Sequence, residues 1–103
     1  MPTTVWVSLN PAEDVDARVR RDGIDPGPHG ELAAAYAQNA IVAITSAVCT
    51  AAPGATVSIT LDRDAPFRLA VDSGTLSDYP LVEWAAVDAR DAAMDAAVAE
   101  VGA

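Results

Sequence analysis

The sequence predicts an α+β fold, a two-layer sandwich in which a small three-stranded sheet carries helices on one face, in the order β-α-α-β-β-α. Three short segments alternate apolar and polar residues, as strands with one buried face do. Two long alanine-rich segments lack this alternation, and a shorter segment has helix-capping residues at its ends. A chain of 103 residues, 51% of them hydrophobic, suffices for one domain, residues 1–103, with a modest core.

Strands are predicted at residues 3–9, 55–61 and 67–72, each with an apolar residue at every second position. Only residues 62–66 separate the second strand from the third, so we expect these two strands to form a hairpin. Two helical segments precede the hairpin, which allows the first strand to lie parallel to one hairpin strand. One sheet face should be apolar and covered, and the other small, polar and open.

Helices are predicted at residues 11–22, 31–52 and 80–101. The first begins after Asn10, a favoured capping residue that a proline follows, and it ends at Gly23. Each long helix carries a stripe spaced by four and three residues, along which another backbone can approach closely. The stripes are Ala33, Ala37, Ala40, Ile44, Ala47 and Ala51, and Ala85, Ala89, Ala92, Ala96, Ala99 and Ala103.

The helix at residues 31–52 is the most apolar part of the chain, since no charged residue stands between Glu31 and Asp62. An uncharged run of about 20 residues is long enough to span a membrane. Polar side chains interrupt this run and no Lys or Arg flanks it, so we interpret it as a core helix buried on more than one side. The side chains expected in the core of the protein are Ile44, Val48, Val57, Ile59, Leu69 and Val71.

The charge balance is strongly acidic. Asp and Glu number 15 against 6 basic residues, all of them Arg, so the net charge is −9. Nucleic acids and anionic lipids are bound by clustered basic residues, so we expect no direct nucleic-acid partner and no membrane partner. The first residues lack the pattern of a signal peptide, so we expect a cytoplasmic protein. Arg without Lys, together with abundant Ala, is typical of a high-GC bacterium or its phage.

The chain lacks the residues that most catalytic and metal sites require. His29 is the only histidine and has no partnered nucleophile, and Cys49 is the only cysteine. Asp62, Asp64 and Asp72 could gather at one end of the hairpin, but their spacing matches no calcium loop. No phosphate-binding or dinucleotide-binding motif is present. We therefore expect no enzyme activity, no cofactor and no metal site.

The last helix carries the first candidate binding surface. Its residues are spaced by four, three and four positions, so they lie along one line of the helix and combine negative charge with an aromatic tip. This surface, called the acidic strip below, consists of Trp84, Asp88, Asp91 and Asp95. The functional interpretation is a site for a basic partner, and the alternative is a solvated helix face in an acidic protein.

The open face of the sheet carries the second candidate surface. Trp6 stands among serines and threonines there, and tryptophan is a common anchor in protein interfaces. The alternative is that a loop, such as residues 24–30, covers Trp6. Arg68 on the same face can anchor an anionic ligand or pair with Asp72, as surface ion pairs commonly do.

These observations favour a small acidic interaction module without enzyme activity. Inhibitors, immunity-like proteins and phage-encoded modulators belong to this class, and the expected partner is another protein, with a basic protein as one candidate. The first alternative is a self-assembling subunit, either a homodimer or a component of a phage particle, joined through the alanine stripes or a sheet edge. The second alternative is a small-molecule-binding domain with a pocket near His29, Tyr36 or Arg68.

Overall fold

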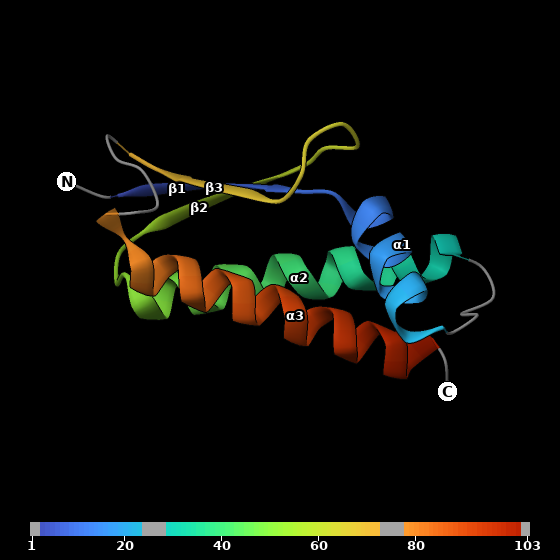
Figure 1. Cartoon of the computed structure of the whole chain (residues 1–103). Coiled ribbons are helices and arrows are strands. Elements are labelled where there is room, and N and C mark those ends of the chain that lie inside the picture. The colour runs from blue at the N-terminus through green and yellow to red at the C-terminus, as the bar shows by residue number, and fades with distance from the viewer. Residues whose placement is uncertain (1–2, 24–28, 73–77, 102–103) are drawn as a thin grey trace.

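Three strands form one mixed sheet, and two long helices cover one of its faces (Figure 1). The computed structural model describes residues 3–23, 29–72 and 78–101. Along the chain the elements are β1 (Thr4–Leu9), α1 (Pro11–Asp22), α2 (His29–Ala51), β2 (Thr56–Leu61), β3 (Arg68–Val71) and α3 (Pro80–Val101). The predicted α+β fold and element order are therefore confirmed, with boundaries within about two residues of the prediction.

The central strand of the sheet is β1, in the order β2-β1-β3. It runs parallel to β2, with Val7 opposite Ile59, and antiparallel to β3, with Val7 opposite Leu69. The predicted parallel pairing of the first strand is confirmed, but the predicted hairpin is wrong because β1 lies between β2 and β3. In this place β1 is paired along both edges, and its apolar side chains Val5, Val7 and Leu9 are fully buried.

Capping residues fix both ends of α1, as the sequence predicts. The Asn10 Oδ1 atom accepts a hydrogen bond from the Glu13 backbone N–H (3.2 Å), while Nδ2 donates to the Glu13 carboxylate (3.1 Å) and to the Arg63 carbonyl (2.8 Å). Asn10 is buried, so its amide ties α1 to the connection between β2 and β3. At the other end Gly23 adopts a left-handed conformation (φ 64°) and donates its N–H to the Val19 carbonyl.

The long helix α2 contributes one stripe of side chains to the core. It consists of the fully buried residues Leu32, Tyr36, Ala40, Ile44 and Val48. By length and composition alone, residues 30–51 would also suffice to cross a membrane. In the fold this stripe packs with the sheet and α3, so α2 is a core helix, but full burial is confined to one stripe, whereas the sequence predicts burial on more than one side. The outer face of α2 stays open, and Val42 on it is 71% exposed.

The rotation of α3 differs from the prediction. The predicted stripe is wrong in its C-terminal part: Ala85 and Ala89 are half-buried, but Ala92, Ala96 and Ala99 are exposed, and Ala103 lies outside the described residues. The side chains that α3 buries are Val82, Ala86, Ala93, Met94 and Ala97. Val82 and Met94 are the larger side chains on this face, and burying them removes more apolar area from water than burying alanine does.

The core is complete under β1 and β3 but thins toward β2. Four of the predicted core residues, Ile44, Val48, Leu69 and Val71, are buried. Val57 and Ile59 are only partly buried, and Leu61 on the same face is 54% exposed. Strand order alone does not explain this difference, because β3 is also an edge strand and its Leu69 and Val71 are buried; the helices cover the sheet less completely under β2.

Candidate interaction site

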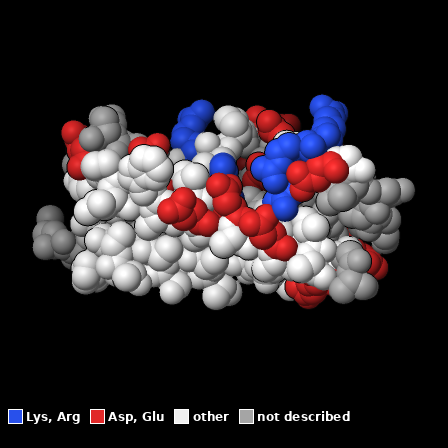
Figure 2. Space-filling model, turned by 60° about the horizontal axis from the view of Figure 1, so that its bottom comes forward, with Lys and Arg blue, Asp and Glu red and all other residues white. Residues whose placement is uncertain are grey.

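The acidic strip lies along one flank of α3. Trp84 is 67% exposed, and all three aspartates are exposed. Figure 2 shows acidic side chains in a row across the middle of this face, with arginines above them and a largely uncharged surface below. The predicted spacing thus places the four side chains on one accessible surface.

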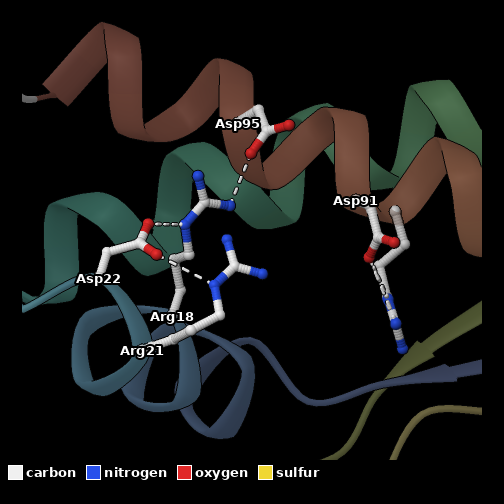
Figure 3. Close-up of polar contacts among 6 residues, drawn as sticks. Arg18, Arg21, Asp22, Asp91 and Asp95 are labelled. Atoms are coloured by element: carbon white, nitrogen blue, oxygen red, sulfur yellow. Dashed lines mark hydrogen bonds and ion pairs between the residues drawn. The ribbon is translucent and has the colours of Figure 1, made fainter.

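Asp95, at the C-terminal end of the acidic strip, pairs with a cation from another helix. The Arg18 guanidinium of α1 reaches across to the Asp95 carboxylate at 2.6 Å and also contacts Asp22 on its own helix (Figure 3). The two hydrogen-bonded carboxylates, first Asp22 and then Asp95, raise the pKa of Arg18. Asp95 is therefore an anchor between α1 and α3 as well as a member of the acidic strip.

Asp22 lies at the end of α1 and accepts hydrogen bonds from two arginines. Arg21 Nε donates to one carboxylate oxygen at 3.0 Å, and Arg18 Nε donates to the other. Hydrogen bonds from Arg21 and then from Arg18 lower the pKa of Asp22. The end of α1 therefore holds one carboxylate between two guanidinium groups, close to the end of α3 (Figure 3).

Asp91, in the middle of the acidic strip, has a weaker partner on its own helix. The Arg90 guanidinium lies 3.3 Å from the Asp91 carboxylate, and its central carbon stands 4.4 Å from the centroid of the Phe67 ring. This cation–π contact joins α3 to the start of β3. Within the described residues no cation pairs with Asp88, so negative charge is least compensated toward the Trp84 end of the acidic strip.

A hollow of about 430 Å³ opens between α1 and α3, beside the acidic strip. It is lined by Asp14, Ala17, Arg18, Arg21, Arg90, Asp91, Met94 and Asp95. Beneath the α1 side, the fully buried Tyr36 donates its hydroxyl to the Asp14 carboxylate at 2.5 Å. The lining of the hollow contains both acidic and basic side chains, so the hollow does not select an anion or a cation by charge alone.

Trp6 and Arg68 lie on the outer face of the sheet, apart from the acidic strip on α3. Trp6 is 47% exposed and stands opposite Ser58 and Ala70, while Arg68 stands opposite Ser8. Residues 24–28, in the loop considered as a cover for Trp6, are outside the described part of the chain. The sequence-predicted site residues thus belong to two separate surfaces.

The remaining candidate ligands do not come together. Asp72 accepts a hydrogen bond from the Thr4 backbone N–H at 2.9 Å, and no ion pair joins Asp72 to Arg68. Asp72 lies beside the start of β1 and Asp62 beside its end, so the gathering of Asp62, Asp64 and Asp72 that was considered from the sequence does not form. In residues 3–23, 29–72 and 78–101 no group of His, Cys, Asp and Glu could hold a metal ion.

Tyr36 and Arg68, two of the three positions considered from the sequence for a small-molecule pocket, lie in different parts of the fold. Tyr36 is fully buried under α1, whereas Arg68 points outward from the sheet, and the His29 side chain lies outside the described residues.

Sequence reasoning missed the two contacts of α1, Arg18 with Asp95 and Asp14 with Tyr36. The order of acidic and basic residues along α1 was the available signal, but it could not identify partners that are distant in the sequence.

No protein-family model matches the chain, and no curated protein or solved structure shows significant similarity to it.

Proposed function

We propose that the protein is a non-enzymatic interaction module that binds a basic partner protein through the acidic strip of α3. The observation that carries this proposal is the largely exposed Trp84, in line with Asp88 and Asp91 on the flank of one rigid helix. Tryptophan offers a large contact area at little cost in conformational entropy, and it is enriched among the residues that dominate binding energy. Inhibitors, immunity-like proteins and phage-encoded modulators remain the proposed classes.

Charge supplies the second support for this proposal. A chain with a net charge of −9 attracts basic partners from a distance, and rim charges raise the association rate more than the final affinity. Asp88 pairs with no cation among the described residues, and Asp91 pairs only with Arg90 of its own helix at 3.3 Å, so both are more available to a partner than Asp95, which pairs with Arg18 of α1 at 2.6 Å. A partner would therefore meet Trp84, Asp88 and Asp91 first.

The test is capture of partner proteins from a bacterial lysate at low and at high salt, compared across variants. We expect at least one basic protein to be retained at low salt and released at high salt. Asp88→Asn combined with Asp91→Asn should abolish its retention, and so should Trp84→Ala. Leaving Asp95 intact preserves the ion pair between α3 and α1, so a loss of retention would not come from breaking that pair.

A matched control lies on the same helix. Glu83→Gln combined with Glu100→Gln removes the same amount of charge from exposed positions that are not on the line of the acidic strip. Retention should survive in this control. Equal loss in both double variants would mean that net charge alone drives capture, and unchanged retention in the Asp88 and Asp91 variant would remove the acidic strip from the mechanism.

A further inference from the structure

The strand β2 leaves one edge of the sheet without a partner in the described chain. Its residues, TVSITL, include no charge, no proline and no glycine. Natural proteins blunt exposed strand edges with such residues, with bulges or with very short strands. The other edge, β3, is only 4 residues long, carries Arg68 and follows Pro66. The protein therefore protects β3 and leaves β2 open for pairing.

The hydrogen bonds between β2 and β1 show which residues of β2 direct their N–H and C=O groups toward the free edge. The N–H groups of Thr56 and Asp62 donate to β1, to the carbonyls of Thr3 and Leu9. Because N–H and C=O groups alternate in direction along a strand, the odd-numbered residues turn these groups away from β1. Val57, Ile59 and Leu61 are therefore the residues that a new strand would meet.

The side of α2 next to β2 continues this open surface. Ile41, Thr45 and Cys49 are spaced by four residues and share one line of α2. The Cys49 thiol lies 3.5 Å from the Ala55 carbonyl, directly before β2, so the C-terminal end of this line lies beside the start of β2. Ile41, at the other end of the line, is 38% exposed, and Leu61 at the end of β2 is 54% exposed. We call the β2 edge with this line of α2 the β2 flank.

The absence of charged residues from the β2 flank favours a second copy of the chain as its occupant. Two copies of a chain with a net charge of −9 repel each other wherever their acidic residues meet. The β2 flank lies within residues 32–61, which carry no charge, so two copies can meet there without opposing carboxylates. The acidic strip lies on α3, which contacts β3 through Arg90 and Phe67, at the other side of the sheet.

We propose that the β2 flank binds a second copy of this chain, with β2 pairing antiparallel to β2 of the partner about a two-fold axis at Ile59. In this register Ile59 faces its own copy, Val57 faces Leu61 of the partner subunit, and Ser58 faces Thr60 of the partner subunit. Apolar residues then meet on the covered face and hydroxyl residues on the outer face, so the strand is complementary to itself. The two sheets become one, and the exposed lines of α2 approach each other.

Sedimentation equilibrium of the full chain over a wide concentration range tests the proposal. The expected mass rises from that of the 10.6 kDa monomer to that of a dimer as the concentration increases. Ile59→Pro removes an N–H that faces the free edge and no hydrogen bond to β1, so it should weaken dimerisation by about tenfold or more. Ile59→Ala loses similar side-chain packing but keeps that N–H, and it should dimerise more tightly than the proline variant.

A disulfide test fixes the register and remains informative if Ile59→Pro fails to fold. In a Cys49→Ser background, the variant Ser58→Cys with Thr60→Cys should crosslink between copies on oxidation, because residues 58 and 60 face each other across the axis. Thr56→Cys with Ser58→Cys, on the same outer face, should not crosslink. A monomer mass at every concentration would overturn the proposal and leave the β2 edge to a strand of another protein. A dimer that crosslinks through neither cysteine pair, or only through the pair at residues 56 and 58, would also overturn it.

Discussion

Tyr36 is the residue at which the core meets the charged surface. Its ring is fully buried in the stripe of α2, and its hydroxyl donates to Asp14 on α1. Burial, followed by the hydrogen bond to the Asp14 carboxylate, raises the pKa of Tyr36 far above its usual value of 10.0. The neutral phenol is therefore the form that the folded state requires.

This shift of the Tyr36 pKa predicts a loss of stability in alkali. Above pH 10.0 the unfolded chain releases the Tyr36 proton while the folded chain keeps it, so the stabilisation that is complete below pH 10.0 declines as pH rises. The decline attributable to this group is about 1.4 kcal/mol per pH unit. Tyr36→Phe should cost about 1–3 kcal/mol near neutral pH through the lost hydrogen bond, and this cost should shrink above pH 10.0.

Urea unfolding of both proteins at a series of pH values between neutrality and strong alkali measures this difference. The comparison cancels the other groups that titrate in this range, since they are present in both proteins. A gap between wild type and Tyr36→Phe that is constant across the whole series would show that Tyr36 ionises equally in the folded and unfolded states.

At the scale of elements, the helix pair α2 and α3 depends on which alanines lie between the helices. Ala86 and Ala97 of α3 and Ala40 of α2 are fully buried, whereas Ala92 and Ala96 face solvent. Alanine at a contact lets two helices approach closely, and a longer side chain there would force them apart. Ala96 and Ala97 are neighbours in the sequence, yet Ala97 is buried in the core and Ala96 is exposed to solvent.

Leucine substitution at neighbouring positions of α3 tests this rotation. Ala97→Leu should destabilise the protein by about 1–3 kcal/mol through overpacking. Ala96→Leu adds the same side chain on the exposed face, so its effect should stay within about 0.5 kcal/mol. Thermal or chemical unfolding measures both, and a larger loss in Ala96→Leu than in Ala97→Leu would show that α3 is rotated differently from the described fold.

At the scale of the whole molecule, charge is distributed unevenly. The run from residue 32 to residue 61 has none, and the acidic residues crowd onto α1, α3 and the connections. The molecule is elongated, with extents of 45 × 24 × 18 Å, and its arginines link α1 to α3 and α3 to β3. These links offset only part of the repulsion that a net charge of −9 produces.

Salt should therefore stabilise the folded protein at neutral pH. Raising NaCl from about 10 mM to about 300 mM shortens the screening length severalfold and weakens repulsion among the carboxylates. A gain of about 1 kcal/mol would raise the melting temperature by roughly 4–8 °C. Melting curves at one low protein concentration measure the effect, and repeating them near the isoelectric point of about 4.1 provides the control. A melting temperature that falls with salt at neutral pH would mean that the ion pairs outweigh the repulsion.

Local patterns in the sequence determined the types of element and nearly all of their ends. Strand alternation, the Asn10 and Gly23 caps and the uncharged run after Glu31 act over neighbouring residues, so they can be interpreted without knowledge of the fold. The same periodicity placed Trp84, Asp88, Asp91 and Asp95 on one surface of α3, because helical spacing does not depend on tertiary contacts.

The tertiary structure decided the strand order, the rotation of α3 and the partners of the charged groups. Each of these depends on residues far apart in the chain: β1 enters between β2 and β3, Val82 and Met94 bury more area than the neighbouring alanines, and Arg18 meets Asp95. Periodicity identifies which face of an element is apolar, but it does not identify the element that covers that face. Only packing decides this, because it maximises the apolar area removed from water over the whole molecule at once.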